Sequence, residues 1–160
     1  MISTTMRAQV SELLALKKHM PGALLVLLHD IQDLAGYIPA ELVGDIAAAL
    51  NLSRAEVHGV ITFYHHFRSV PPSATVVQVC RAEACQSMGA QKLWDHAVSC
   101  AATANGKHGD AAVSVEPVYC LGLCSTAPAV QINSALHARV QIEQVEGLLT
   151  HALTQQGAAA

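Results

Sequence analysis

Up to Val70 the chain repeats apolar side chains at the three- and four-residue spacing of amphipathic helices. The stretches with this spacing are 10–16, 24–34, 42–50 and 57–61. Pro21 is expected within the first turn of the second helix, which tolerates proline, and Gly36 is expected to end that helix. The third helix is predicted to begin near Pro39. Ser53 and Glu56 have the capping-box spacing, in which each side chain binds a backbone donor beside the other, so a fourth helix is predicted to begin there.

The pattern changes at Pro71-Pro72, because two consecutive prolines end the helical spacing. A β-branched run predicts a strand over 75–79, and helical spacing then returns over 88–104, with Gly106 closing the helix. The remaining predicted elements are strands over 112–118, 129–132 and 136–142, with a hairpin turn at Asn133-Ser134, a helix over 143–153 and a frayed tail. Pro117 indicates a strand that lies at an edge of the sheet or ends there.

The order strand–helix–strand–strand–strand–helix is that of a small α/β sheet of thioredoxin type. We therefore expect an α/β chain with an N-terminal helical bundle over 1–72, a thioredoxin-like domain over 73–154 and a tail over 155–160. Apolar residues make up 52% of the 160 positions, which is enough to bury a core.

Charge and hydropathy narrow the classes of function. The formal net charge is −3, so the chain lacks the basic footprint of proteins that bind nucleic acid or anionic lipid. The strongest apolar run, 23–28, is far shorter than the roughly 20 residues that a membrane span requires, and 1–10 contain no apolar targeting segment. We expect a cytoplasmic protein with no membrane contact. In that compartment five cysteines favour metal or redox chemistry over disulfides.

Four of the cysteines form two close pairs, and each pair directly follows a predicted strand. Cys80 and Cys85 are separated by four residues, Cys120 and Cys124 by three, and 34 residues lie between the pairs. Loops at neighbouring strand ends would bring the pairs together. A [2Fe–2S] core needs two thiolates on each iron, so one loop can serve each iron. Gly122 would let the backbone approach such a core and offer N–H groups to its sulfurs.

The same cysteines are compatible with other hypotheses. A structural zinc site also uses four cysteines at two- to four-residue spacings, whereas four buried core thiols are disfavoured because the residues cluster in two loops. A thioredoxin-type dithiol is disfavoured, since neither loop has two residues between its cysteines. Cys100 falls within a predicted helix and is expected to be a core thiol.

The cysteine loops, Val79–Cys85 and Val118–Cys124, resemble those of the thioredoxin-like [2Fe–2S] subunit of NADH dehydrogenases. That family includes the small peripheral subunit of complex I and its counterparts in NAD-reducing hydrogenases and NAD-dependent formate dehydrogenases. The resemblance covers about 21–149 and includes three further segments, 31–39, 52–64 and 127–130. Within the family, 80–87 and 64–67 are most similar to the gamma subunit of formate dehydrogenases. Ser125-Thr126 departs from the usual pattern but leaves the cysteines intact.

The resemblance implies one [2Fe–2S] cluster, held as cofactor and metal site by Cys80, Cys85, Cys120 and Cys124, in a chain without a catalytic residue. It implies a hetero-oligomer with an FMN- and NAD-binding flavoprotein subunit and a large molybdenum- or tungsten-pterin subunit. The chain would be the electron-transfer subunit of a soluble NAD-dependent formate dehydrogenase. The alternatives are the same subunit of an NAD-reducing hydrogenase or complex I, a free-standing ferredoxin, and a zinc-binding assembly module.

Several residues near these motifs could have either a functional or a purely structural role. Arg81 could raise the reduction potential of a neighbouring cluster, or it could be a solvated surface residue. Met88 and Trp94 are expected to pack within the fold rather than to carry electrons. His65-His66 are expected to be structural, and His58 has no suitably spaced carboxylate or cysteine that would make it a metal ligand.

Overall fold

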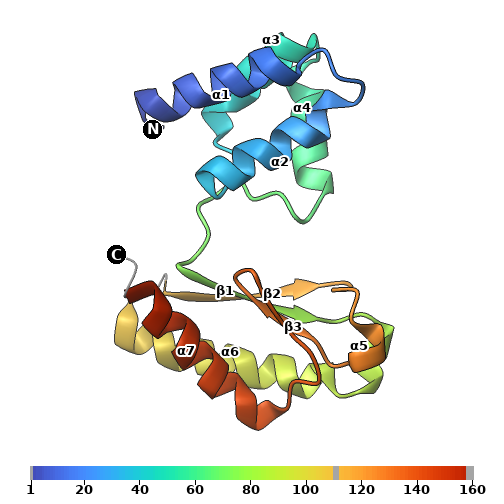
Figure 1. Cartoon of the computed structure of the whole chain (residues 1–160), viewed down its shortest axis with the longest axis vertical. Coiled ribbons are helices and arrows are strands. Elements are labelled where there is room, and N and C mark those ends of the chain that lie inside the picture. The colour runs from blue at the N-terminus through green and yellow to red at the C-terminus, as the bar shows by residue number, and fades with distance from the viewer. Residues whose placement is uncertain (1, 110–111, 158–160) are drawn as a thin grey trace. The chain divides into compact units, whose positions relative to one another are not determined.

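The computed structural model describes residues 2–109 and 112–157, which form two compact units divided between Pro72 and Ser73. The first unit is helical and the second is a sheet covered by helices (Figure 1). The predicted fold class, a helical bundle followed by an α/β domain of thioredoxin type, is confirmed. No helix within the described ranges is both long enough and apolar enough to cross a membrane.

The helical unit contains α1 (Thr4–Lys17), α2 (Ala23–Ala35), a 3-10 turn (Ala40–Leu42), α3 (Val43–Leu50) and α4 (Arg54–Phe63). Its core is built from the apolar stripes of these helices; the largest buried side chains are Val10, Leu27, Leu28, Ile31, Ile38, Leu42, Ile46 and Val57. The capping box at the start of α4 is confirmed, because Ser53 Oγ accepts from Glu56 N at 3.1 Å and Ser53 N donates to Glu56 Oε2 at 2.7 Å. Gly36 ends α2 in the left-handed conformation, as predicted.

Gln32 closes this unit through two hydrogen bonds that the apolar pattern does not reveal. Its side chain is 5% exposed, and its Nε2 donates to the backbone oxygen of His66 at 2.8 Å. Its Oε1 accepts from the backbone N–H of Arg68 at 2.7 Å. A buried amide that satisfies both a donor and an acceptor of an irregular segment holds that segment in place. The chain after α4 is therefore fastened to α2.

The second unit is a four-stranded sheet in the order β2-β1-β3-β4. The strands are β1 (Thr75–Cys80), β2 (Val113–Val118), β3 (Val130–Ile132) and β4 (Ala135–His137), and the helices are α5 (Glu83–Ser87), α6 (Ala90–His108) and α7 (Val145–Gly157). β1 and β2 are parallel, whereas β3 is antiparallel to both β1 and β4. Helices α6 and α7 lie side by side on one face of the sheet (Figure 1). β2 is an outer strand, as Pro117 indicated.

Some predicted boundaries were wrong for identifiable reasons. Pro21 precedes α2 instead of lying in its first turn, because Gly22 in the left-handed conformation is the cap. Gly106 lies inside α6, which runs on to His108, since an exposed glycine only weakens a helix. The second hairpin strand stops at His137, and a 3-10 turn at Ile142–Gln144 leads into α7. The tail predicted from 155 continues α7 to Gly157, and its last three residues lie outside the described part of the chain. The short helix α5 was not predicted.

Candidate metal centre

The two cysteine loops begin at the same edge of the sheet. In the parallel pairing of β1 with β2, Cys80 lies opposite Val118, so both strands deliver their following loops side by side. The backbone N–H of Arg81 donates to Val118 O at 2.8 Å, and the N–H of Cys80 donates to Ala129 O at 3.0 Å. These bonds join the first loop to β2 on one side and to the segment before β3 on the other.

The four thiols meet where these loops converge. Cys120 Sγ lies 3.7 Å from Cys124 Sγ, and the Cys80 and Cys85 thiols lie close enough to shift each other's pKa. The second loop also reaches the first, because the backbone N–H groups of Cys120 and Leu121 lie near the Cys80 sulfur and help to lower its pKa. The structure therefore brings together all four cysteines singled out in the sequence, although 34 residues separate the pairs.

Backbone conformation turns N–H groups of the second loop toward sulfur. Cys120 has φ of 121° and Gly122 has φ of 75°. Residues other than glycine rarely adopt positive φ angles of this size. In this conformation the Gly122 N–H donates to Cys120 Sγ at 3.3 Å. N–H groups aimed at sulfur stabilise its thiolate form, which is the form that binds metal.

The two pairs differ in their access to solvent. Cys80 and Cys85 are each 2% exposed, and small side chains surround them, including Ala82, Ala90 and Ala129. Cys120 and Cys124 are exposed at the surface. A group held by all four sulfurs would be covered on the side of the first pair and open on the side of the second.

The thiol pKa values follow these surroundings. Burial alone would raise the pKa of Cys80, but N–H donors from both loops and the hydrogen bond from Cys85 outweigh it and lower the pKa. Burial and the same hydrogen bond raise the pKa of Cys85. The hydrogen bond with Cys120, and the charge of that neighbour, raise the pKa of Cys124.

The donor set matches the needs of a two-iron core. Within 2–109 and 112–157 no group of three or more histidine, cysteine, aspartate or glutamate side chains is arranged around a single ion position. In a [2Fe–2S] core each iron takes two thiolates. Two adjacent sulfur pairs, with backbone N–H groups already directed at sulfur, fit that core.

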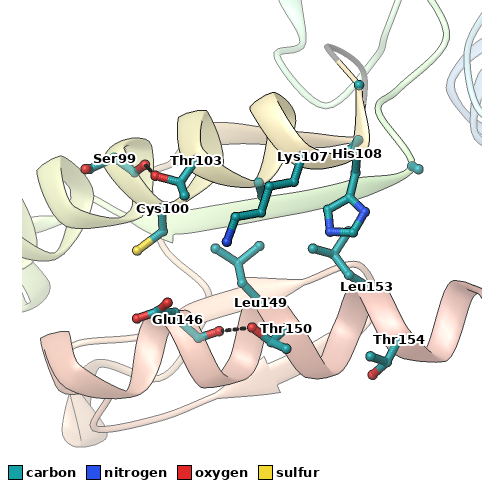
Figure 2. Close-up of a pocket in the computed structure, with 14 residues that line it drawn as sticks. Ser99, Cys100, Thr103, Lys107, His108, Glu146, Leu149, Thr150, Leu153 and Thr154 are labelled. Carbon is teal, nitrogen blue, oxygen red and sulfur yellow. Dashed lines mark hydrogen bonds between the residues drawn. The ribbon is translucent and has the colours of Figure 1, made fainter.

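Cys100 lies apart from this centre, as the sequence predicted. It lines a cavity of about 1080 Å³ between α6 and α7, together with Lys107, Glu146 and Leu149, and none of the other four cysteines lines this cavity (Figure 2). Its Sγ is 3.4 Å from His96 Nε2. Burial, with a smaller contribution from the charge of Glu146, raises its pKa, so this thiol is kept protonated.

Arg81 is held by α6, the helix that follows the first cysteine loop. Its guanidinium lies 5.1 Å from the centre of the Trp94 ring, a cation–π contact, and it donates a hydrogen bond to Gln91. The charge beside Cys80 is therefore fixed in position rather than free in solvent. Trp94 packs against the core of this unit, whereas Met88 is 61% exposed, contrary to the expectation that it packs within the fold.

The histidines of the helical unit form a structural contact. The His66 ring lies 5.1 Å from that of His29, and His29 contacts the buried Phe67 at 5.0 Å. Burial, together with the charges of His29 and Arg68, lowers the pKa of His66, and Asp33 opposes this shift. His58, His65 and His66 are all exposed, so the contacts with His29 and Phe67 cover only part of the His66 ring. The structural role expected for His65-His66 stays a prediction.

Comparison with known proteins identifies the same type of domain. A family model for the thioredoxin-like [2Fe–2S] ferredoxin matches residues 10–153. NADH-quinone oxidoreductase subunit 2 of Thermus thermophilus is 36% identical over 70% of the chain, and the match covers 62% of that protein. An NADH-quinone oxidoreductase subunit of Aquifex aeolicus is 32% identical over 77% of the chain and 79% of the relative.

Hydrogenases also contain similar chains. The NADP-reducing hydrogenase subunit HndA of Solidesulfovibrio fructosivorans is 31% identical over 80% of the chain and 75% of that subunit. A crystal structure of an NAD⁺-reducing [NiFe]-hydrogenase in the H₂-reduced state matches with a TM-score of 0.67 and 25% identity, over 82% of this chain but only 22% of the hydrogenase chain. The chain therefore belongs to the thioredoxin-like [2Fe–2S] ferredoxin family, a family of electron-transfer proteins with one [2Fe–2S] cluster, as its cysteine loops indicated.

Proposed function

We propose that Cys80 and Cys85 bind one iron of the cluster and that Cys120 and Cys124 bind the other. The observation that carries this assignment is the meeting of the two loops: Cys80 lies opposite Val118 in the sheet, and backbone N–H groups of the second loop lie near the Cys80 sulfur. When bound, a [2Fe–2S] cluster accepts and releases one electron at a time. The chain would serve as an electron-transfer subunit with no substrate site of its own.

The residues around the sulfurs would set how readily the centre takes an electron. All-cysteine ligation leaves more negative charge on the core than histidine ligation, which favours a low potential. The N–H groups that donate to the Cys80 and Cys120 sulfurs oppose this effect, because they stabilise added negative charge. Arg81 follows Cys80 in the sequence and is held in place by its contact with Trp94. Its positive charge would also stabilise the added electron and so raise the potential.

The ligand assignment is tested by single Cys→Ser variants of the whole chain. Cys80→Ser, Cys85→Ser, Cys120→Ser and Cys124→Ser should each lose most of the visible absorption and the bound iron after anaerobic reconstitution. Cys100→Ser is the matched control and should retain about two iron per chain, because Cys100 lies in a separate cavity. Equal loss from Cys100→Ser and Cys120→Ser would refute the assignment, and stoichiometric zinc in a colourless protein would favour the zinc-binding assembly module instead.

For the complex as a whole, we propose a soluble NAD-dependent formate dehydrogenase. This chain would exchange electrons with an FMN-bearing subunit that oxidises or reduces the nicotinamide, and a large subunit would carry a molybdenum- or tungsten-pterin. Support comes from the segments 80–87 and 64–67, which resemble the gamma subunit of those enzymes. Neither formate nor nucleotide would bind to this chain.

A second candidate is the same subunit in an NAD(P)-reducing hydrogenase or an NADH-quinone oxidoreductase. The names of the Solidesulfovibrio, Thermus and Aquifex relatives favour this alternative. Copurification with a tagged chain from its native cells separates the candidates. Molybdenum or tungsten with formate-dependent NAD⁺ reduction supports the first, nickel or hydrogen-dependent reduction supports the second, and a chain that purifies alone supports a free-standing ferredoxin.

A further inference from the structure

The two cysteine pairs give the centre one open side. Cys80 and Cys85 are each 2% exposed, whereas Cys120 and Cys124 lie at the surface. Tyr119, the residue before this exposed pair, is 70% exposed. Electron transfer becomes steeply slower as the distance between donor and acceptor increases. A partner that approaches from the side of Cys120 and Cys124 therefore has the shorter path.

A hollow of about 630 Å³ lies next to this open side. Ser125, which follows Cys124, lines it together with Met88 and Lys92 from the α5–α6 region and Arg139 from the segment after β4. The Arg139 backbone N–H donates to Thr126 O at 2.8 Å, so this segment is fastened directly to the turn that contains Cys124. The hollow is therefore lined by the segment that directly follows the exposed cysteine pair.

The charges that line this hollow are of one sign. Lys92 and Arg139 line it, and among the described residues no aspartate or glutamate does. Asp95, one turn along α6 from Lys92, instead accepts a hydrogen bond from Gln91 at 2.8 Å. The chain as a whole carries a formal charge of −3, so the local charge is opposite in sign to the average. Such a patch attracts an acidic surface and orients it before contact.

We propose that this hollow is the docking site for an acidic face of the protein that exchanges electrons with the centre. The inference rests on the proposed function, since it assumes a cluster on the four cysteines. One electron passes between the reduced centre and a one-electron acceptor in the partner, or in the reverse direction, with no bond formed and no proton moved. Met88, 61% exposed, and Tyr119 would supply the apolar contacts, because flexible methionine and amphipathic tyrosine side chains suit such surfaces.

Lys92→Glu and Lys107→Glu form a matched pair for testing this. Both lysines are exposed on α6, and each substitution changes the net charge equally. Lys107 follows Lys92 by 15 positions, which places it about 22 Å further along the helix, away from the cysteine loops. At 0.1 M ionic strength charges are screened over about 10 Å, so only Lys92 should influence chemistry at the exposed cysteines.

The first measurement uses the cluster-free chain and two thiol reagents, the dianion 5,5′-dithiobis(2-nitrobenzoate) and neutral 4,4′-dithiodipyridine. Peptide mapping should show Cys120 and Cys124 reacting before Cys80 and Cys85. At Cys120 and Cys124, followed separately from Cys100 by the peptide mapping, Lys92→Glu should slow the dianion about twofold relative to the neutral reagent, and Lys107→Glu should not. Equal effects of the two substitutions, or earlier labelling of the buried pair, would overturn the proposal.

The second measurement uses the reduced, cluster-loaded chain and two one-electron oxidants of opposite charge, tris(oxalato)cobaltate(III) and hexaamminecobalt(III). Lys92→Glu should slow oxidation by the trianion about threefold and accelerate oxidation by the trication by a similar factor at 0.1 M ionic strength. Lys107→Glu should change neither rate noticeably. Identical responses of the two variants would mean that electrons leave elsewhere. If no cluster can be loaded, the proposed function fails, while the thiol measurement still tests the charge of the surface.

Discussion

Replacing Gln32 with leucine tests how the helical unit is held together. The side chain is buried and makes two hydrogen bonds, at 2.8 Å to His66 O and at 2.7 Å from Arg68 N. Leucine is similar in size but can replace neither bond. Each backbone group left without a partner costs about 1–2 kcal/mol when it is partly shielded from water, so Gln32→Leu should lower the free energy of unfolding by about 2–4 kcal/mol.

Urea unfolding followed by far-UV circular dichroism measures this loss, since most of the helical unit consists of helix. Gln131→Leu is the matched control. Gln131 lies in β3, is half-buried and makes one side-chain hydrogen bond, to the backbone oxygen of Asn133 at 2.7 Å. That variant should lose less than about 1 kcal/mol.

Hydrogen exchange locates the effect. In Gln32→Leu the Arg68 amide should exchange much faster, because its hydrogen bond is removed without a substitute. A loss no larger than that of Gln131→Leu, with unchanged exchange at Arg68, would show that the segment after α4 is held by something other than Gln32.

Three further predictions concern the cysteine loop, a helix cap and pH. Gly122→Ala should shorten the lifetime of the visible cluster spectrum, because the backbone φ of 75° at this position costs alanine about 1 kcal/mol. Gly147→Ala, in a helix, is the control and should leave the lifetime unchanged. Equal lifetimes of the two variants would contradict the prediction. Ser53→Ala should lower the free energy of unfolding by about 1 kcal/mol through loss of the α4 cap, measured by urea unfolding. Partial burial and the neighbouring charges of His29 and Arg68 lower the pKa of the exposed His66 from 6.5, so the unfolded chain binds this proton first. Stability should therefore fall slightly as pH drops below about 6.5. His66→Gln should flatten that pH dependence, and an unchanged profile would contradict the assignment to His66.

The open side of the metal centre has a consequence for partner choice. Relatives of this chain are named as subunits of several different oxidoreductases. A centre covered on one side and exposed on the other can be kept constant while the surface around it changes. We expect the residues that line the hollow beside Cys124, rather than the cysteines, to decide which complex this chain joins.

Local sequence determined the elements and the chemistry available. The apolar spacing, the capping box at Ser53 and the stop at Gly36 depend on neighbours within one or two turns, so they could be read directly from the chain. The two cysteine pairs and their spacing also predicted the type of centre, because ligand pairs on short loops reflect how a two-iron core is bound.

Only the tertiary structure decided which cysteines are covered, where the charges lie and how the irregular segments are held. The parallel register of β1 and β2 brings Cys80 beside Val118 and so joins loops that are far apart in the chain. Arg81 contacts Trp94, and Gln32 binds the segment after α4, across different elements. Lys92 and Arg139 line one hollow although they also come from different elements. Such contacts depend on how the elements pack and not on local spacing, so a periodic pattern carries no record of them.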